Sequence, residues 1–305
     1  MKILYFDPQA GVSGDLFLGA LVDLGVDFNA LSEALASLNI GGFSLKQTPT
    51  KRHTIAATKV DVVVEDVPHP HRHLPDLVKI ITASPLAEIV KQQSIQVLTK
   101  LAQAESTVHR MPLQSVHLHE VGGLDCLVDV VGTVWAINAL KVQHHIAKIY
   151  SGPVSVGSGF VKCAHGNMPL PAPGTLGILQ GFPIRRTTFN FEMTTPTGAA
   201  LISTLAEAHT TPMIFTPEAV GYGAGTRDPK EVANLFRVVI AELHQAPNQA
   251  LSATHTHSHS HSHAHTHDHS HDHDHGHSHD HEHSHSDDHE HDHHHNHTHE
   301  HEHTH

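Results

Sequence analysis

Cysteines and long apolar runs are both scarce in this chain. Only two cysteines, Cys126 and Cys163, occur in 305 residues, which excludes a disulfide framework and predicts reduced thiols. No apolar run approaches the roughly 18 residues that a membrane-spanning helix needs, so no membrane partner is expected. The first apolar stretch is short and is stopped by Asp7, which predicts a strand rather than a signal peptide. We therefore expect a cytoplasmic protein.

Basic residues are absent from the last part of the chain, and this absence marks a boundary. Residues 251–305 contain 26 of the 38 histidines and 11 of the 31 acidic residues, but no Lys, Arg, Phe, Tyr or Trp. Such a composition cannot build a core. It predicts a globular body at 1–248 and a disordered low-complexity tail at 249–305. The body is nearly neutral and has no basic stripe, so no nucleic-acid partner is expected.

The tail has the composition of a metal-ligand array. From position 255 to 285 a histidine stands at every second position, mostly with small polar or acidic residues between. Neutral imidazole binds zinc, copper and nickel, and a flexible segment can bend about two to four imidazoles around one ion. The carboxylates favour a dication, and the lack of Cys and Met disfavours copper(I). The predicted ligands are His255, His257, His259, His261, His263, His265, His267, His269, His271, His273, His275, His277, His279, His281, His283 and His285.

Three other interpretations of the tail compete with metal binding. They are a purification tag, a pH-responsive solubilising segment and a low-complexity segment without a selected role. A tag is usually a short unbroken run of histidines, unlike this long alternating one. Because protons compete with metal for the imidazole nitrogens, metal binding should weaken below about pH 6. Composition favours metal binding and leaves nickel and zinc as alternatives.

Periodicity in the body predicts a mixed α/β (α+β) fold. Strands are expected at the N-terminus and at 43–46, 54–64, 146–150, 154–156 and 234–241. Helices are expected from Ser13 or Asp15 to Gly25, and at 29–38, 74–82, 85–108 and 122–140. Another helix is expected with Thr195 as N-cap and Pro196 and Thr197 in its first turn, and it continues through 198–205. The Gly and Pro-rich passage at 157–174 predicts irregular chain. No P-loop, dinucleotide-binding glycine motif, nucleophile elbow or Cys-x-x-Cys motif occurs, so common enzyme classes are unsupported.

Carboxylates follow the first predicted strand. Asp7 ends that strand, and Asp15 lies after the turn, together with Ser13. Carboxylates in such a turn can hold a cation or a phosphate-bound metal. The alternative is that Ser13 and Asp15 only cap the next helix.

A second group of metal donors lies near the middle of the body. His117 and His119 fall on one face of an extended chain beside Glu120, and Asp125 and Asp129 follow about one helical turn apart. These side chains are suitable ligands for a divalent metal, and His165 adds a further imidazole. Surface histidines with acids at a helix start explain the same pattern equally well.

Hydroxyls also gather at one predicted helix start. The segment 193–198 offers the hydroxyl groups of Thr195 and Thr197 and the backbone amide of Gly198. An anionic group such as a phosphate can bind there, because backbone N–H groups at a helix start lack partners. A plain capped helix is the alternative.

Taken in order, these segments resemble the family of nickel insertion proteins for the nickel-pincer cofactor, called LarC. The resemblance covers most of the body. It rests on Asp7 with 11–15, Ala104-Glu105 with His109, 116–122 with Asp125 and Asp129, 164–166 with Pro169 and 171–173, and Glu192 with 194–200. Two positions differ, because Leu16 and Cys126 stand where the family usually has Met and Ser.

The resemblance implies a role in making the cofactor of lactate racemase. The family inserts nickel into pyridinium-3,5-bisthiocarboxylic acid mononucleotide with help from CTP, which places Ni²⁺ above Zn²⁺ as the ion. The resemblance also gives the predicted anion site a ligand, the phosphate of that mononucleotide. The resemblance also implies apo lactate racemase as a partner. A second copy of the chain is a further expected partner.

Family members usually continue into a C-terminal domain that is associated with the nucleotide. The body here runs into the tail instead. We therefore expect a nickel-donating N-terminal portion of a CTP-dependent insertase, a lyase-type enzyme, that is not active alone. CTP and its divalent metal would be used only when a C-terminal portion is supplied. The alternatives are a non-enzymatic nickel store or metallochaperone, and a zinc buffer.

Overall fold

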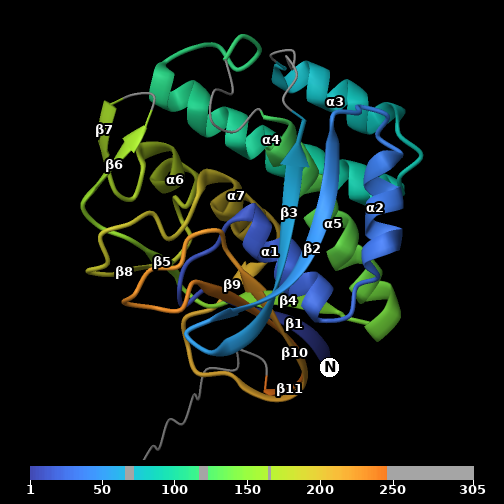
Figure 1. The fold of residues 1–305 in the computed structure, drawn as a ribbon, viewed down its shortest axis with the longest axis vertical. Helices are drawn as coiled ribbons and strands as arrows, with labels where there is room; N and C mark the ends of the chain where they lie inside the picture. The colour runs from blue at the N-terminus through green and yellow to red at the C-terminus, as the bar shows by residue number, and fades with distance from the viewer. Residues whose placement is uncertain (66–71, 117–122, 164–165, 246–305) are drawn as a thin grey trace, which may run out of the picture. The chain divides into compact units, whose positions relative to one another are not determined.

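A mixed β-sheet forms the frame of the protein (Figure 1). The computed structural model describes residues 1–65, 72–116, 123–163 and 166–245. The strands of the sheet are β1 (Lys2–Asp7), β2 (Phe43–Arg52), β3 (Ile55–Val64), β4 (Lys148–Ser151), β9 (Glu207–Ala208), β10 (Ile214–Ala224) and β11 (Leu235–Gln245). Their order across the sheet is β2-β3-β10-β11-β1-β4-β9. Outside it, β5 (Val154–Val156) pairs with β8 (Ile184–Arg186), and β6 (Phe160–Cys163) pairs with β7 (Gly166–Pro169).

The sheet contains both antiparallel and parallel strand pairs. The β2–β3 and β10–β11 pairs are antiparallel, and β11 also runs antiparallel to β1. By contrast, β1 is parallel to β4, and β3 is parallel to β10. The predicted mixed α/β fold is therefore confirmed.

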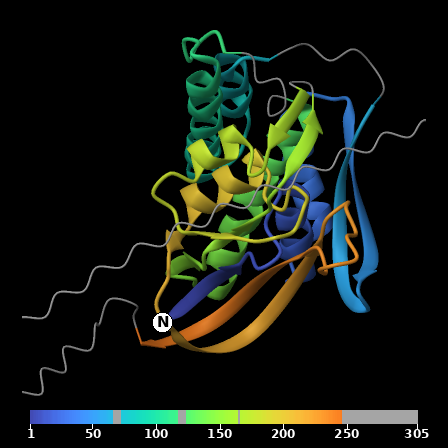
Figure 2. The same ribbon diagram turned by 90° about the vertical axis from the view of Figure 1, so that its left-hand side faces the viewer.

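Helices cover one face of the sheet (Figure 2). They are α1 (Gly14–Asp23), α2 (Phe28–Ala36), α3 (Leu74–Ala83), α4 (Glu88–His109), α5 (Leu124–His144), α6 (Pro173–Ile178) and α7 (Pro196–Leu205). Helix α1 packs directly on β3 and β10 and also against α5, whereas α4 packs on α5, α6 and α7. The helices thus form a layer next to the sheet and a second layer beyond it. No helix in the described ranges is long and apolar enough to cross a membrane.

Alternating side chains on the strands separate two apolar clusters. On β1, Leu4 and Phe6 face the helices, and Phe6 packs against Phe17 of α1 with ring centroids 5.1 Å apart. Phe17 in turn contacts Phe236 of β11 at 4.6 Å. Ile3 belongs to the smaller cluster on the other face. Burying these rings stabilises the α1–sheet contact, since each large side chain contributes about 1.5–3 kcal/mol.

Three glycines let α1 lie against the backbone of the sheet. A Cβ atom on Gly223 would overlap the carbonyl oxygen of Leu16, and one on Gly221 would overlap that of Ala20. From the helix side, a Cβ atom on Gly19 would overlap the carbonyl oxygen of Thr58 on β3. The close approach therefore requires glycine on both surfaces. It fixes the height of α1 above the sheet.

Most predicted elements are present, with shifted ends. The helix expected from Ser13 begins with Ser13 as N-cap, and the helix expected after Thr195 begins at Pro196 with Thr195 as N-cap, as predicted. The expectation of irregular chain at 157–174 was wrong, because that passage contains the β6–β7 hairpin and the start of α6. Strand β10 was not predicted at all.

Candidate functional site

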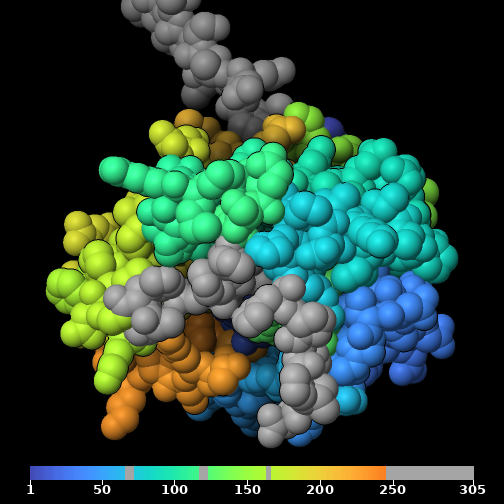
Figure 3. Space-filling model, turned by 90° about the horizontal axis from the view of Figure 1, so that it is seen from above, coloured from blue at the N-terminus to red at the C-terminus, as the bar shows by residue number. Residues whose placement is uncertain are grey.

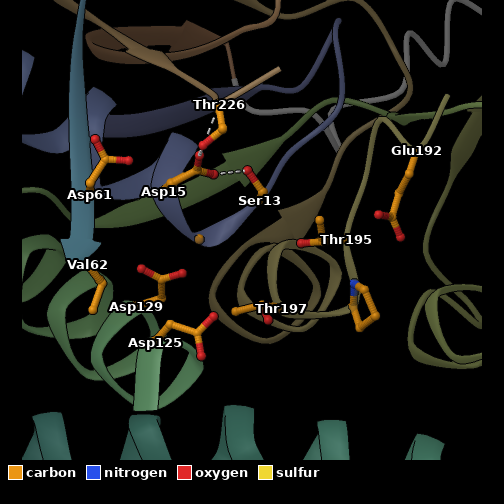
Figure 4. Close-up of a pocket in the computed structure, with 12 residues that line it drawn as sticks. Ser13, Asp15, Asp61, Val62, Asp125, Asp129, Glu192, Thr195, Thr197 and Thr226 are labelled. Carbon is orange, nitrogen blue, oxygen red and sulfur yellow. Dashed lines mark hydrogen bonds between the residues drawn. The ribbon is translucent and has the colours of Figure 1, made fainter. Parts of the chain in front are cut away.

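A cavity of about 380 Å³ lies where three helices begin (Figure 4). This volume is within the range of small-molecule sites. The lining residues come from the starts of α1, α5 and α7, from β3, and from two loops. They are Ser13, Gly14, Asp15, Asp61, Val62, Asp125, Asp129, Glu192, Thr195, Pro196, Thr197 and Thr226. Figure 3 shows the molecule from above. In that view the loop between β10 and β11, coloured orange, lies on the opposite side from α3 and α4.

The N-terminal ends of the helices give the cavity a mixed electrostatic character. Backbone N–H groups at the start of a helix carry partial positive charge and favour nearby anions. This accounts in part for acids in the first turns, as Asp15 is in α1 and Asp125 is in α5. Five carboxylates line the same cavity, on Asp15, Asp61, Asp125, Asp129 and Glu192. A cation is attracted to the carboxylates and an anion to the helix ends.

The carboxylate of Asp15 is held in place from two sides. One oxygen accepts hydrogen bonds from the Ser13 hydroxyl and from the backbone N–H of Leu16, the latter at 2.9 Å. The other accepts from the N–H of Thr226 at 3.2 Å and from its hydroxyl at 3.4 Å. Ser13 occupies the N-cap position of α1 but makes no side-chain cap bond, because its hydroxyl points to Asp15 instead. The helix start and the β10–β11 loop are thereby joined.

One carboxylate oxygen of Asp129 is enclosed by the fold. Its Oδ1 atom is buried and has no hydrogen-bond partner among the described residues. Burial raises the pKa of Asp129 well above its usual value, and the charges of Asp15 and Asp125 raise it further. Gly14 makes room for this side chain, because a Cβ atom there would overlap the carboxylate. Asp129 is therefore a proton or cation acceptor in a place where an unpaired negative charge is costly.

The remaining carboxylates have different surroundings. Asp61, on β3, forms an ion pair with Lys59 of the same strand. Glu192 lies 3.8 Å from the guanidinium of Arg227. Asp125 is exposed at the mouth of the cavity. These three carboxylates surround the cavity, so they add negative potential without forming one compact ligand set.

The start of α7 confirms the predicted cap. Thr195 is the N-cap, and its hydroxyl accepts a hydrogen bond from the N–H of Gly198 at 3.2 Å. That amide is therefore already used, and Gly198 is packed so closely on Val12 that a Cβ atom would overlap the Val12 carbonyl oxygen. Pro196 has no N–H, so among the described residues the backbone amide of this turn that has no hydrogen-bond partner is that of Thr197.

Cys126 lies beneath the cavity and contacts Thr197. Its sulfur is 3.5 Å from the Thr197 hydroxyl oxygen. Burial raises the pKa of Cys126 to about 12, with the carboxylates of Asp129 and Asp125 adding to the effect. A thiol that stays protonated near neutral pH is a poor metal ligand, since metals bind the thiolate. The Cys126 side chain therefore contacts a lining residue, Thr197, and does not itself line the cavity.

The structure brings together only some of the residues predicted to bind metal. Asp15, Asp125 and Asp129 line one cavity, whereas Asp7 forms an ion pair with Arg237 and lines a separate hollow. His117, His119, Glu120, His165 and the tail histidines at 255–285 lie outside the described residues. In the parts of the chain that are described, no group of three or more His, Cys, Asp or Glu side chains is close enough to hold a metal by itself.

Sequence reasoning missed Asp61, Thr226 and Arg227. Asp61 stands in an alternating run of β-branched residues, where a lone acid looks like the solvent side of a strand. Thr226 is 211 positions from its partner Asp15. No local pattern could have shown that contact. Glu192 was noticed only through the family resemblance.

A smaller hollow of about 150 Å³ lies on the other side of Pro196. It is lined mainly by apolar side chains of α4 and α6, together with an ion pair between Glu105 and His109 at 3.3 Å. These are residues of the family resemblance as well. Pro196 lines both spaces, so the start of α7 separates them.

The fold and the cavity define a mixed α/β protein with an acid-lined polar site of small-molecule size. A family model described as nickel insertion protein matches residues 4–277. The chain belongs to the nickel insertion protein family.

Two relatives illustrate how similar the chain is. A pyridinium-3,5-bisthiocarboxylic acid mononucleotide nickel insertion protein of Clostridium kluyveri is 42% identical over 254 residues, covering 79% of this chain and 62% of the relative. A protein of the same name from Geobacillus kaustophilus is 40% identical over 264 residues, covering 84% of this chain and 63% of the relative. The chain thus spans about three-fifths of the length of these relatives. No solved structure matches it.

Proposed function

We propose that this chain binds nickel and delivers it to pyridinium-3,5-bisthiocarboxylic acid mononucleotide during assembly of the nickel-pincer cofactor. The observation that carries the proposal is the convergence of Asp15, Asp125 and Asp129 with the start of α7 around one cavity. Nickel is the cargo of the reaction, and the relatives named above are described as nickel insertion proteins for that mononucleotide.

The charges around the cavity suit a cation that is held briefly and then passed on. An anionic mononucleotide would be repelled by the carboxylates, but a divalent ion between them offsets that repulsion. One or two carboxylates, with water and donor atoms of the substrate, hold such an ion less tightly than a closed cage of protein ligands. Release into the substrate then requires few bonds to break.

Other parts of the proposal come from the sequence. His117, His119 and Glu120 are proposed as further transfer ligands, and the histidines at 255–285 as the nickel collector. CTP-dependent insertion in concert with a C-terminal portion, and supply of the product to apo lactate racemase, follow from the family resemblance. A nickel store or zinc buffer is the competing function.

Removing the tail should separate collection from delivery. A chain ending at residue 250 is expected to bind about one nickel ion, whereas the full chain binds several, because most imidazoles are in the tail. Isothermal titration of nickel and of zinc, with and without the mononucleotide, measures both properties. Retained mononucleotide binding by the shortened chain supports delivery. Metal uptake without any mononucleotide binding would instead establish a store or buffer.

The start of α7 should contribute to binding of the mononucleotide phosphate. We expect the double substitution Thr195→Val and Thr197→Val to weaken mononucleotide binding about tenfold, because two hydroxyl groups are lost. The Thr195 change also removes an N-cap, which costs about 1 kcal/mol of stability. Asp27→Ala removes the N-cap of α2, far from the cavity, and serves as the matched control. Unchanged affinity in a folded double variant would refute the phosphate assignment.

A further inference from the structure

A second hollow adjoins the acidic cavity and adds a positive charge to it. It has a volume of about 150 Å³ and shares Ser13, Asp15, Glu192, Thr195 and Thr226 with the larger cavity. Its further wall comes from the loop between β10 and β11, which contributes Arg227. Among the described residues that line the two spaces, Arg227 is the one with a cationic side chain.

The backbone around Arg227 is fixed by contacts on both sides. The preceding residue, Thr226, donates its N–H to Asp15 at 3.2 Å. The carbonyl oxygen of Arg227 itself accepts a hydrogen bond from the side-chain amide of Asn234 at 2.9 Å. Gly225 allows Asn234 to come close, because a Cβ atom there would lie only 2.5 Å from the Asn234 amide nitrogen. The backbone from which the Arg227 side chain extends is therefore held in place at the rim of the hollow.

Among the described residues, the Arg227 side chain has no hydrogen-bond partner, and its one ion pair is with Glu192. Its side chain is 49% exposed, and the nearest carboxylate oxygen, on Glu192, is 3.8 Å away. That separation is beyond normal hydrogen-bond distance, so the pair is an electrostatic attraction without a bidentate bond. A guanidinium at such a site can take up a tetrahedral oxyanion with two parallel N–H···O bonds.

We propose that Arg227 binds the phosphate of the substrate in this second hollow, which adjoins the acidic cavity, opposite Thr195 at the start of α7. This inference rests on the proposed function. Glu192 holds the guanidinium near the hollow until the incoming phosphate displaces it. A space of about 150 Å³ accommodates a phosphate group but not a substituted pyridinium ring as well. The ring is thereby directed into the larger cavity, toward Asp129.

The test compares binding of the mononucleotide to the full chain and to single variants with nickel present, because the cavity carboxylates repel the anion when no divalent ion lies between them. Arg227→Ala should weaken binding about tenfold, which is the scale of a partly exposed charge-assisted hydrogen bond. Arg227→Lys should retain part of the affinity. Arg186→Ala is the matched control, because Arg186 is exposed on β8 and lines neither space, while the change in net charge is the same.

The chemistry of the ligand provides a second readout. Inorganic phosphate should compete with the mononucleotide on the wild-type chain and lose most of that ability on the Arg227→Ala variant. CTP in the same competition distinguishes a site for the monophosphate from one for a triphosphate. Glu192→Gln should bind the mononucleotide as well as or better than wild type, because the displaced carboxylate is gone.

Different failures have different meanings. If wild type binds the mononucleotide and Arg227→Ala behaves like Arg186→Ala, the inference about Arg227 is wrong and the proposed function stands. If CTP competes and inorganic phosphate does not, the hollow is a nucleoside triphosphate site, and the assignment of the mononucleotide phosphate to Arg227 is overturned. A Glu192→Gln variant that loses as much affinity as Arg227→Ala contradicts the displacement. If the wild-type chain binds no mononucleotide, the proposed function itself fails.

Discussion

Replacing Asp129 with asparagine is expected to stabilise the protein near neutral pH and to weaken metal binding in the cavity. The Oδ1 atom of Asp129 is buried without a partner among the described residues, and its neighbours Asp15 and Asp125 are acids. Removing the ionisable group should add about 1–3 kcal/mol to the free energy of unfolding, because a buried charge without a partner is more costly than a neutral amide of the same shape. The loss of a carboxylate donor should lower cavity affinity for nickel roughly tenfold or more.

The gain in stability should depend on pH with a defined sign. Because the folded-state pKa of Asp129 is raised above its unfolded value, the folded protein binds the proton more tightly. The stability that this proton contributes is fully present below the unfolded pKa, and it is lost as pH rises through the folded pKa. The difference between variant and wild type should therefore be smallest near pH 4 and should grow toward neutral pH. Metal binding by wild type should likewise strengthen as this proton is released.

Urea unfolding between pH 4 and pH 8, together with nickel titration of the chain ending at residue 250, measures both effects. Asp125→Asn is the control, because Asp125 lies on the same helix but is exposed, and its effect on stability should stay within about 0.5 kcal/mol. Equal stability of wild type and Asp129→Asn at every pH would show that Asp129 is satisfied in the folded protein. Unchanged nickel affinity of the Asp129→Asn variant would show that Asp129 is not a nickel ligand.

A methyl group added at Gly223 is expected to destabilise the protein by about 3 kcal/mol or more. The new Cβ atom would overlap the backbone carbonyl of Leu16 and lie close to the N–H of Ala20, so α1 must move as a unit. Backbone atoms on both sides leave no flexible side chain to yield, which places this change among the most costly types of overpacking. Displacement of α1 also moves Asp15, so cavity binding should fall together with stability.

The matched control is Gly177→Ala, the same chemical change on the exposed side of α6. Only the Ala104 side chain lies near the added atom, at 4.0 Å, so this variant should be neutral or more stable by up to about 1 kcal/mol. Unfolding midpoints in urea at one pH compare the two. A Gly223→Ala variant as stable as wild type would mean that α1 and the sheet can separate without loss.

The contrast between β1 and β10 shows what local sequence could predict. Strand β1 is short and apolar, and its buried side chains alternate between the two faces of the sheet, so its local sequence predicts a strand. Strand β10 contains Pro217, Gly221 and Gly223, which locally argue against a strand. Pro217 lies at a shift in the register with β11, and the two glycines lie beneath α1. Contacts with β11 and α1 therefore explain why this strand contains residues that disfavour a strand in the local sequence.

The candidate site divides in the same way. Ser13, Asp15 and Thr195 were recognisable because a polar residue before an apolar helix is a local signal. The assembly of these segments with Asp61 and Thr226 was not recognisable, because no pattern in one segment specifies its distant neighbour. Asp7 illustrates the converse: the right residue type in a suggestive turn is paired with Arg237, which is 230 positions away.

The hydrogen bonds from Thr226 to Asp15 join two points near opposite ends of the body, and this has a consequence for protein synthesis. A nascent chain that has emerged only as far as α7 already carries the acids of α1, β3 and α5. It lacks Thr226, Arg227 and the two central strands β10 and β11, on which α1 rests. Domains fold as units once their whole length is available. The cavity can therefore exist only after the last strand has left the ribosome, and an unfinished chain cannot hold an ion there.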